Sequence, residues 1–229
     1  MNAPQFYKIN SILSVILFLA FAGLLGSCTN TQKTKNSLPI FGERMAIKKV
    51  QNGKIIVDTI FHRIPDFGFI NQDSQQVTER TFARKIYVSD FFFTSCPTIC
   101  PKMRTQLQRV YQQFKNNNQV LLLSHTLDPE RDSVAVLRDY AQSMGVSSKK
   151  WHFVTDAKDS IYAIASKYMV AATENSKKGG LIHSGALVLI DTNRHVRGIY
   201  DGTKPEQVDY LLADIQTLLA EKNLSHTFN

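Results

Sequence analysis

The 229-residue chain lacks the charge blocks that are typical of nucleic-acid-binding proteins. It has 27 Lys and Arg against 19 Asp and Glu, a formal net charge of +8, and these residues are scattered in ones and twos. No stripe of basic and aromatic residues accompanies the positive charge. The chain also lacks internal repeats and low-complexity tracts. We therefore expect one globular domain with a solvated surface, and no nucleic-acid partner.

Long hydrophobic runs are missing too, except for one at the N-terminus. Residues 9–25 carry no charge, follow the single cation Lys8, and lead into Gly26, Ser27 and Cys28. An apolar run of this kind is typical of a secretion signal. Because it is also about long enough to span a bilayer, a retained transmembrane helix remains an open alternative.

The residues at 25–28, Leu-Gly-Ser-Cys, resemble the lipobox of bacterial lipoproteins. The resemblance implies a signal peptide over 1–27 and makes Cys28 the lipid-modified first residue of the mature chain. The polar stretch that follows, within 28–38, predicts a flexible tether, and 39–229 is the expected folded domain. On either interpretation the domain is extracytoplasmic, on the periplasmic side of the cell envelope, and held at a membrane.

Cysteine is scarce, with three in the whole chain, and setting Cys28 aside leaves Cys96 and Cys100. Residues four apart on a helix have Cβ atoms about 5–6 Å apart, so these sulfurs can form a disulfide or bind one ion. Pro101 favours a helix beginning near Cys100. The positive end of that helix is expected to lower the pKa of the thiols.

Alternating strand and helix patterns begin near residue 85 and predict an α/β fold. Apolar runs predict strands and a 3.6-residue period predicts helices. The expected order is strand 85–94, helix 101–114, strand 119–127, helix 133–144, strand 151–156, helix 159–169, a hairpin of 186–191 with 195–200, and helix 205–220.

Two parallel strands crossed by a helix, then an antiparallel hairpin and a final helix, resemble the thioredoxin fold. The cysteines follow the first core strand, where that fold keeps its chemistry. Their spacing of Cys-x-x-x-Cys departs from the Cys-x-x-Cys of thioredoxin-like oxidoreductases. Segments 46–50 and 54–61 flank Asn52-Gly53, which adds an N-terminal β-hairpin region, and a short strand pair is expected within 66–78.

A third metal ligand would distinguish a metal site from a redox pair. Two thiolates are soft ligands that favour Cu(I), Zn or iron–sulfur clusters. Of the six histidines, His183 stands just before the strand expected to lie beside the one leading to Cys96. Three donors are too few for a closed structural zinc site and suit copper.

Four segments together are similar to the Sco/SenC family of copper chaperones over residues 64–220. They are DFGF at 66, FTSCPTICPKM at 93, LDPERDS at 127 and HSGALVLID at 183. The resemblance implies a thioredoxin-like, membrane-tethered domain that binds one copper ion, Cu(I) or Cu(II), through Cys96, Cys100 and His183. It also implies a role in assembling the binuclear copper centre of cytochrome c oxidase subunit II, with an upstream thiol reductant or copper donor.

This chain departs from the family pattern at two positions. Ile182 stands where many members have an acidic residue, and Ser95 stands where a histidine is frequent. Asp128 resembles a family residue near the site, whereas Asp132 or Ser133 is a candidate helix cap. Met103 and Met169 have apolar neighbours at helical spacing, which favours core packing over copper ligation.

Other functions use the same cysteines. In a thiol–disulfide oxidoreductase Cys96 and Cys100 are the redox-active pair and His183 has no metal role; a thiol peroxidase is a weaker variant, since Thr94-Ser95-Cys96-Pro97 only partly echoes such enzymes. A copper or redox sensor is the remaining alternative. For a copper chaperone, oxidation of the pair to a disulfide is expected to abolish copper binding.

Overall fold

The computed structural model describes residues 37–51, 53–175 and 180–226, and within these ranges the side chains of 172–183 and 222–226 are left undescribed. The chain divides into two units, Met1–Asn36 and Ser37–Asn229, and only the second is described. The predicted signal peptide, the lipidation site Cys28 and most of the predicted tether therefore lie outside the described residues. Within the described ranges, no helix has the length and apolar character needed to cross a membrane.

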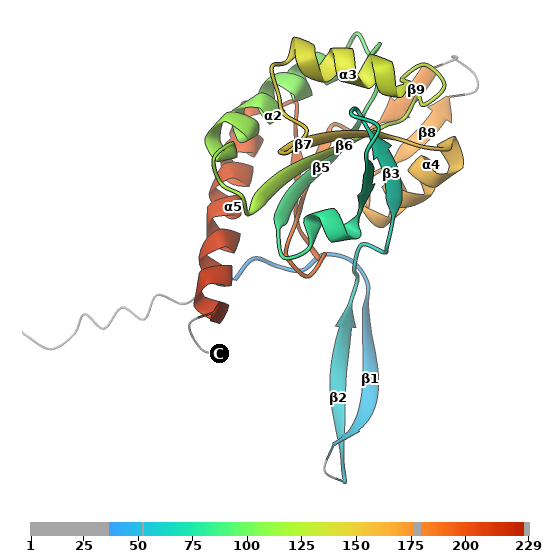
Figure 1. Ribbon diagram of the computed structural model, residues 1–229. Helices are drawn as coiled ribbons and strands as arrows, with labels where there is room; N and C mark the ends of the chain where they lie inside the picture. Colours follow the sequence, from blue (N-terminus) through green and yellow to red (C-terminus); the bar gives the residue numbers. More distant parts are fainter. Residues whose placement is uncertain (1–36, 52, 176–179, 227–229) are drawn as a thin grey trace, which may run out of the picture. The chain divides into compact units, whose positions relative to one another are not determined.

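A seven-stranded mixed sheet forms the centre of the second unit (Figure 1), with the order β11-β10-β5-β6-β7-β3-β4. Three neighbours, β5, β6 and β7, are parallel, and the flanking β10 and β3 run antiparallel to them. The strands are β3 (Gly68–Asn71), β4 (Gln76–Thr78), β5 (Ile86–Phe92), β6 (Val120–Thr126), β7 (Trp151–Thr155), β10 (Ala186–Ile190) and β11 (Val196–Asp201).

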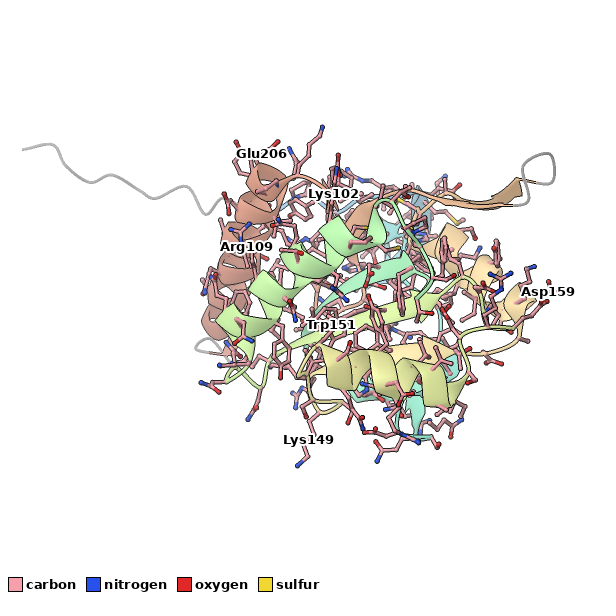
Figure 2. The ribbon with its side chains drawn as sticks, turned by 90° about the horizontal axis from the view of Figure 1, so that it is seen from above. Lys102, Arg109, Lys149, Trp151, Asp159 and Glu206 are labelled. Carbon is pink, nitrogen blue, oxygen red and sulfur yellow. The ribbon has the colours of Figure 1, made fainter. Side chains whose placement is uncertain are left out.

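Helices cover both faces of this sheet. The helices are α2 (Cys100–Phe114), α3 (Val134–Ser143), α4 (Lys158–Lys167) and α5 (Pro205–His226), with a short 3-10 helix, η2 (Glu79–Phe82). Apolar side chains of α2, α3 and α5 form one core with the sheet, and those of α4 and η2 form a second core. Figure 2 shows α2, with Lys102 and Arg109, beside the N-terminal part of α5, with Glu206. Arg109 forms an ion pair with Asp209 there.

Strand β5 separates the two cores because successive side chains of a strand point to opposite faces. Val88 and Phe92 belong to the core under α2, α3 and α5, whereas Tyr87 and Phe91 belong to the core under α4. Every residue of β5 is buried, including Ser89 and Asp90, which interrupt the otherwise apolar run expected of a central strand. These features confirm the thioredoxin-like α/β fold predicted from the sequence.

Two small sheets extend the second unit. The predicted N-terminal hairpin is present, with β1 (Arg44–Gln51) paired to β2 (Lys54–Phe61) across a turn where Gly53 has a φ of 73°. The other sheet, β8 (Ala172–Asn175) with β9 (Gly180–His183), was not predicted, and it contains the backbone of the proposed histidine ligand. Its pairing register places Ala172 opposite His183.

Candidate metal centre

The two cysteines lie together between β5 and α2. Cys96 follows the strand in a tight turn, in which its backbone N–H donates to Phe93 O at 3.3 Å. Cys100 is the first residue of α2, as predicted from Pro101. Both are present as thiols and both are buried, with 8% and 5% of their surface exposed, and a side-chain hydrogen bond joins them. The structure thus brings the predicted pair of sulfurs into contact.

The protonation of Cys100 differs from what the sequence predicts. Burial raises the pKa of its thiol, and although a backbone hydrogen bond at Phe93 lowers it, Cys96 and Asp90 raise it further. The expected lowering by the helix N-terminus is therefore wrong for this residue. Removal from water disfavours a thiolate more than a helix dipole stabilises it. A bound cation reverses this balance, because a coordinated thiol is deprotonated outright.

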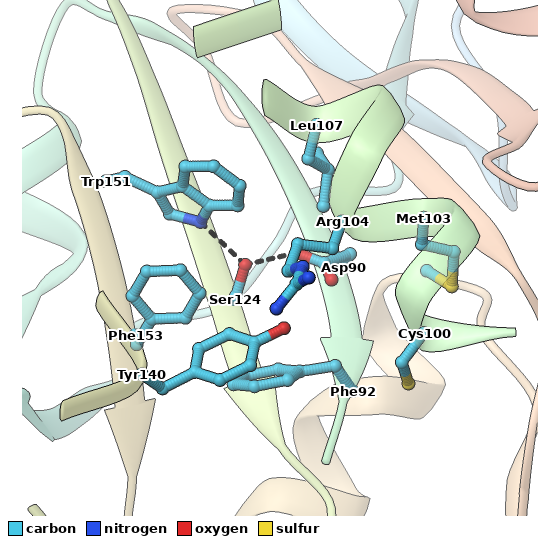
Figure 3. A pocket seen from close by; sticks show the side chains of 10 residues that line it. All are labelled: Asp90, Phe92, Cys100, Met103, Arg104, Leu107, Ser124, Tyr140, Trp151 and Phe153. Atoms are coloured by element: carbon cyan, nitrogen blue, oxygen red, sulfur yellow. Dashed lines mark hydrogen bonds between the residues drawn. The ribbon is translucent and has the colours of Figure 1, made fainter. Parts of the chain in front are cut away.

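A buried polar group lies on the sheet beneath α2 and shares a small cavity with Cys100 (Figure 3). Ser124 of β6 donates a hydrogen bond to Asp90 of β5, and Trp151 Nε1 of β7 donates to Ser124 Oγ at 2.8 Å. Burial raises the pKa of Asp90 to about 7. Sequence analysis missed this group, although a lone aspartate within the apolar strand at 87–93 was a signal.

The segment LDPERDS positions the cysteine loop through Asp132. This fully buried carboxylate accepts hydrogen bonds from the N–H of Thr94 at 3.0 Å and from the hydroxyls of Thr94 and Thr126. Ser133 is the N-cap of α3, with its Oγ accepting from Val136 N at 3.4 Å. Of the two cap candidates, Ser133 is therefore confirmed, while Asp132 holds the backbone two residues before Cys96. Asp128 lies 3.7 Å from Arg131 Nε.

The backbone around His183 approaches the same loop. His183 ends β9, and its side chain lies outside the described side chains. Two residues later, the Cβ position of Gly185 lies 4.0 Å from Cδ1 of Ile99, the residue before Cys100. Ile99, Ser184 and Gly185 line one open cavity together with Asp201 and Thr203. Among the described side chains, no three His, Cys, Asp or Glu residues are grouped to hold a metal ion.

Other candidate ligands belong to the cores. Met103 of α2 is 1% exposed and Met169 packs against the core under α4, so the expected structural role of both is confirmed. His125 stacks on Phe91 with ring centroids 4.6 Å apart, on the opposite face of the sheet from Cys100. Met103 lines the small cavity that Cys100 also lines, whereas His125 is separated from Cys100 by the sheet.

Comparison with known proteins identifies relatives over most of the chain. The SCO1/SenC family model matches residues 60–220. The SCO1 protein homolog of Bacillus subtilis is 27% identical over 168 residues, which cover 72% of this chain and 87% of that protein.

Solved structures agree with this result. BsSco, described as a member of the Sco family of cytochrome c oxidase assembly proteins with a disulfide switch, has a TM-score of 0.61 and 26% identity, covering 69% of this chain and 93% of that one. Arabidopsis thaliana ScoI with copper bound has a TM-score of 0.57 and 25% identity, covering 68% and 98%. A SCO1/SenC family lipoprotein of Bacillus anthracis shares the fold at a TM-score of 0.63 and 24% identity, covering 69% and 95%. The chain described here belongs to the SCO1/SenC family.

Proposed function

We propose that this protein is a membrane-tethered, extracytoplasmic copper chaperone that delivers copper to the binuclear copper centre of cytochrome c oxidase subunit II. The observation that carries the proposal is the buried contact between Cys96 and Cys100 at the start of α2. Two adjacent sulfurs form a soft donor pair, which suits Cu(I) and is unsuited to Mg²⁺ or Ca²⁺.

Cys96, Cys100 and His183 are the proposed ligands of one copper ion, Cu(I) or Cu(II), which is the cargo of the protein. The contact between Gly185 and Ile99 supports this set, because it brings the segment after β9 to the cysteine loop. Three donors leave the ion open to an incoming ligand. Transfer then proceeds by stepwise exchange of ligands with a recipient, and the ion is never released free.

The known proteins support copper as the cargo and an oxidase as the destination. ScoI of Arabidopsis thaliana has been solved with copper bound, and BsSco is described as a cytochrome c oxidase assembly protein. Both match this chain through a shared fold that covers about two thirds of its length, at 68% and 69%. The recipient subunit II follows from the family resemblance of the four sequence segments.

The redox state of Cys96 and Cys100 gates copper loading in this proposal. Copper needs both sulfurs as thiolates, and a disulfide removes both donors. Returning a disulfide to the thiol state takes two electrons and two protons from a thiol reductant. We therefore propose an upstream thiol reductant or copper donor as a second partner. The disulfide switch described for BsSco is in line with this arrangement.

The N-terminal region supplies the membrane tether. We propose that residues 1–27 are a signal peptide, that Cys28 carries the lipid, and that 28–38 separate the lipid from the folded domain of 39–229. The Leu-Gly-Ser-Cys sequence at 25–28 supports a lipid anchor. The lipoprotein of Bacillus anthracis shows that the same fold occurs in a lipid-anchored protein.

Anaerobic titration of the reduced full-length chain with Cu(I), against a competing chelator, tests the copper site. We expect one ion per chain, and loss of binding in Cys96→Ala and Cys100→Ala. His183→Ala should weaken affinity by more than about 100-fold, since even residues that only support a ligand contribute about 10- to 100-fold. The matched control is His195→Ala, in the turn between β10 and β11, which should bind like the parent.

The same samples separate the alternative functions. Unchanged copper stoichiometry and affinity in His183→Ala would remove the third ligand from the proposal. A chain that binds no copper but reduces protein disulfides through Cys96 and Cys100 would be a thiol–disulfide oxidoreductase. A chain that binds copper but passes none to subunit II in a mixed incubation would fit a sensor instead.

A further inference from the structure

The β1–β2 hairpin carries most of the exposed apolar surface. Among described residues, eleven large hydrophobic side chains are exposed, and seven of them lie between 41 and 60. Val50 is 76% exposed and Ile55 is 70% exposed. Apolar patches that stay exposed on a soluble domain usually mark an interaction surface. A lone two-stranded hairpin is also only marginally stable in water, so this one needs a further contact.

Apolar and cationic side chains share the outer part of the hairpin. Val50 lies directly opposite Ile55, and Lys48 lies directly opposite Val57. Because the two pairs are two residues apart along each strand, their four side chains occupy one face of the hairpin. That face therefore combines three exposed aliphatic side chains with a lysine. The two strands together carry four cationic side chains, Arg44, Lys48, Lys49 and Lys54, and one carboxylate, Asp58.

The β1–β2 hairpin extends from one end of the central sheet (Figure 1), and the cysteine loop, which follows β5, lies at the other end. The chain flanking the hairpin bonds to the start of β11 and to the turn before it: Phe41 N donates to Val196 O and Ile64 N donates to Arg194 O, both at 2.9 Å. At this end, Ile190 of β10 pairs with Tyr87 near the start of β5. The cysteines follow the other end of β5.

The point where the chain enters the described domain is fixed at the hairpin end as well. Leu38 N donates to Glu221 Oε1 at 3.1 Å, and Arg197 Nη2 donates to Leu38 O at 2.6 Å. Nine residues, 28–36, precede this point in the proposed tether and reach at most about 30 Å when extended. The eight-residue strands of the hairpin span about 26 Å. The extended tether and the hairpin can therefore span similar distances from the same end of the central sheet.

We propose that the β1–β2 hairpin docks on an anionic lipid bilayer, and that this holds the cysteine end of the sheet away from the membrane. Val50, Ile55 and Val57 enter the interfacial layer, Lys48 contacts anionic headgroups from the same face, and Lys54 contacts them from the turn end of the other face. A lipid surface fits this mixture because lysines keep their charge in water while their stems cover apolar surface, whereas the cores of protein interfaces are depleted of lysine. The proposal rests on the membrane tether of the proposed function.

Tryptophan fluorescence of the full-length chain in vesicles tests the docking. Ile55→Trp places a probe at the hairpin, and Tyr210→Trp places one on α5, where Tyr210 is 62% exposed. Vesicles contain brominated phosphatidylcholine, with or without phosphatidylglycerol. We expect the hairpin probe to shift to the blue and to be quenched in anionic vesicles, while the α5 probe is not quenched. Trp151 is buried and common to both variants, so its emission is a constant background.

Charge reversal provides the matched variant. Each lysine near an anionic surface contributes about a fivefold preference, so Lys48→Glu with Lys54→Glu in the Ile55→Trp background should lower the docked fraction more than tenfold. Copper binding should stay unchanged in all these variants, because the cysteines lie at the other end of the sheet. A loss of copper binding in the parent chain would count against the proposed function and leave the docking result standing.

Flotation with the vesicles separates the tether from the hairpin. A chain that floats with an unquenched hairpin probe has a tether and no docked hairpin, which overturns this inference. A chain that does not float lacks both attachments. If the hairpin probe shifts to the blue without lipid and in proportion to protein concentration, a second copy of the chain is the occupant, and the lipid proposal is wrong.

Discussion

The two ends of the central sheet differ in how their side chains are held. At the C-terminal end of β5, the buried carboxylate of Asp132 holds the cysteine loop through hydrogen bonds from Thr94 and Thr126. At the opposite end, the hairpin leaves Val50 and Ile55 exposed to water. The first region is fixed by contacts between residues far apart in the sequence, and the second by pairing between two adjacent strands. The domain therefore holds its cysteine end through buried long-range contacts, whereas its hairpin end leaves apolar side chains exposed for the contact proposed above.

Removing an aliphatic side chain should have opposite consequences in the two regions. Leu107 of α2 is 2% exposed in the core that contains Cys100, so Leu107→Ala should lower the free energy of unfolding by about 4 kcal/mol. Ile55→Ala, in the hairpin, should leave it unchanged, because this side chain is already hydrated. Urea denaturation followed by circular dichroism measures both, and equal losses would contradict the contrast.

The same comparison can be made with aspartate. Asp132→Ala leaves the N–H and hydroxyl of half-buried Thr94 and the hydroxyl of buried Thr126 without their acceptor, which should cost about 3 kcal/mol. Asp58→Ala removes exposed contacts with Lys49 and with the N–H of Thr59, which water can replace, and should not change the denaturation midpoint. Asp132→Ala should also weaken copper binding, because it releases the loop before Cys96. Full stability in this variant would show that Asp132 does not hold the loop.

Acid should lower the contribution of buried, neutral His125 to the free energy of unfolding. Burial lowers the pKa of His125 to about 3, so below its usual value of about 6.5 the unfolded chain binds a proton that the folded chain does not. The contribution of His125 to stability should therefore fall as the pH drops from about 6.5 towards 3, by about 2 kcal/mol at pH 5, whereas Asp90, with its pKa raised to about 7 by burial, contributes with the opposite sign over this range. His125→Phe should remove this part of the loss.

Burial also lowers the pKa of His152, to about 4, so part of the pH dependence should remain in His125→Phe. Denaturant titrations at pH 7 and pH 5 on the parent and on His125→Phe provide the measurement. An identical drop in the two proteins would assign the acid sensitivity to groups other than His125.

Two glycines with similar positive φ values, one in the hairpin turn and one after α3, allow a comparison in which the smallest effect is expected. Gly53 in the hairpin turn has a φ of 73° and Gly145 after α3 has a φ of 65°, and neither has an atom within 4 Å of its Cβ position. Alanine at a positive φ costs about 1 kcal/mol at either site. Gly145→Ala should lower the denaturation midpoint. Gly53→Ala should only speed hydrogen exchange at Val50 and Ile55, and a change in the midpoint there would tie the hairpin to the core.

Local patterns of the sequence predicted most of the elements. The apolar run of β5, the start of α2 at Cys100 and the turn at Gly53 all follow from the properties of a few neighbouring residues. The strands β8 and β9 were missed because they are short and pair with each other outside the main sheet. The contact of Asp132 with Thr94 spans 38 positions, so no local pattern reveals it.

The sequence by itself determined the fold class, the spacing of Cys96 and Cys100, and the family, because these depend on periodicity and on motifs within single segments. Tertiary structure decided the burial of both sulfurs, the raised pKa of Cys100 and the separation of the hairpin from the cysteine end. These properties depend on which distant segments exclude water from a group. Water exclusion is set by packing across the whole sheet, and the order of residues along the chain does not record it.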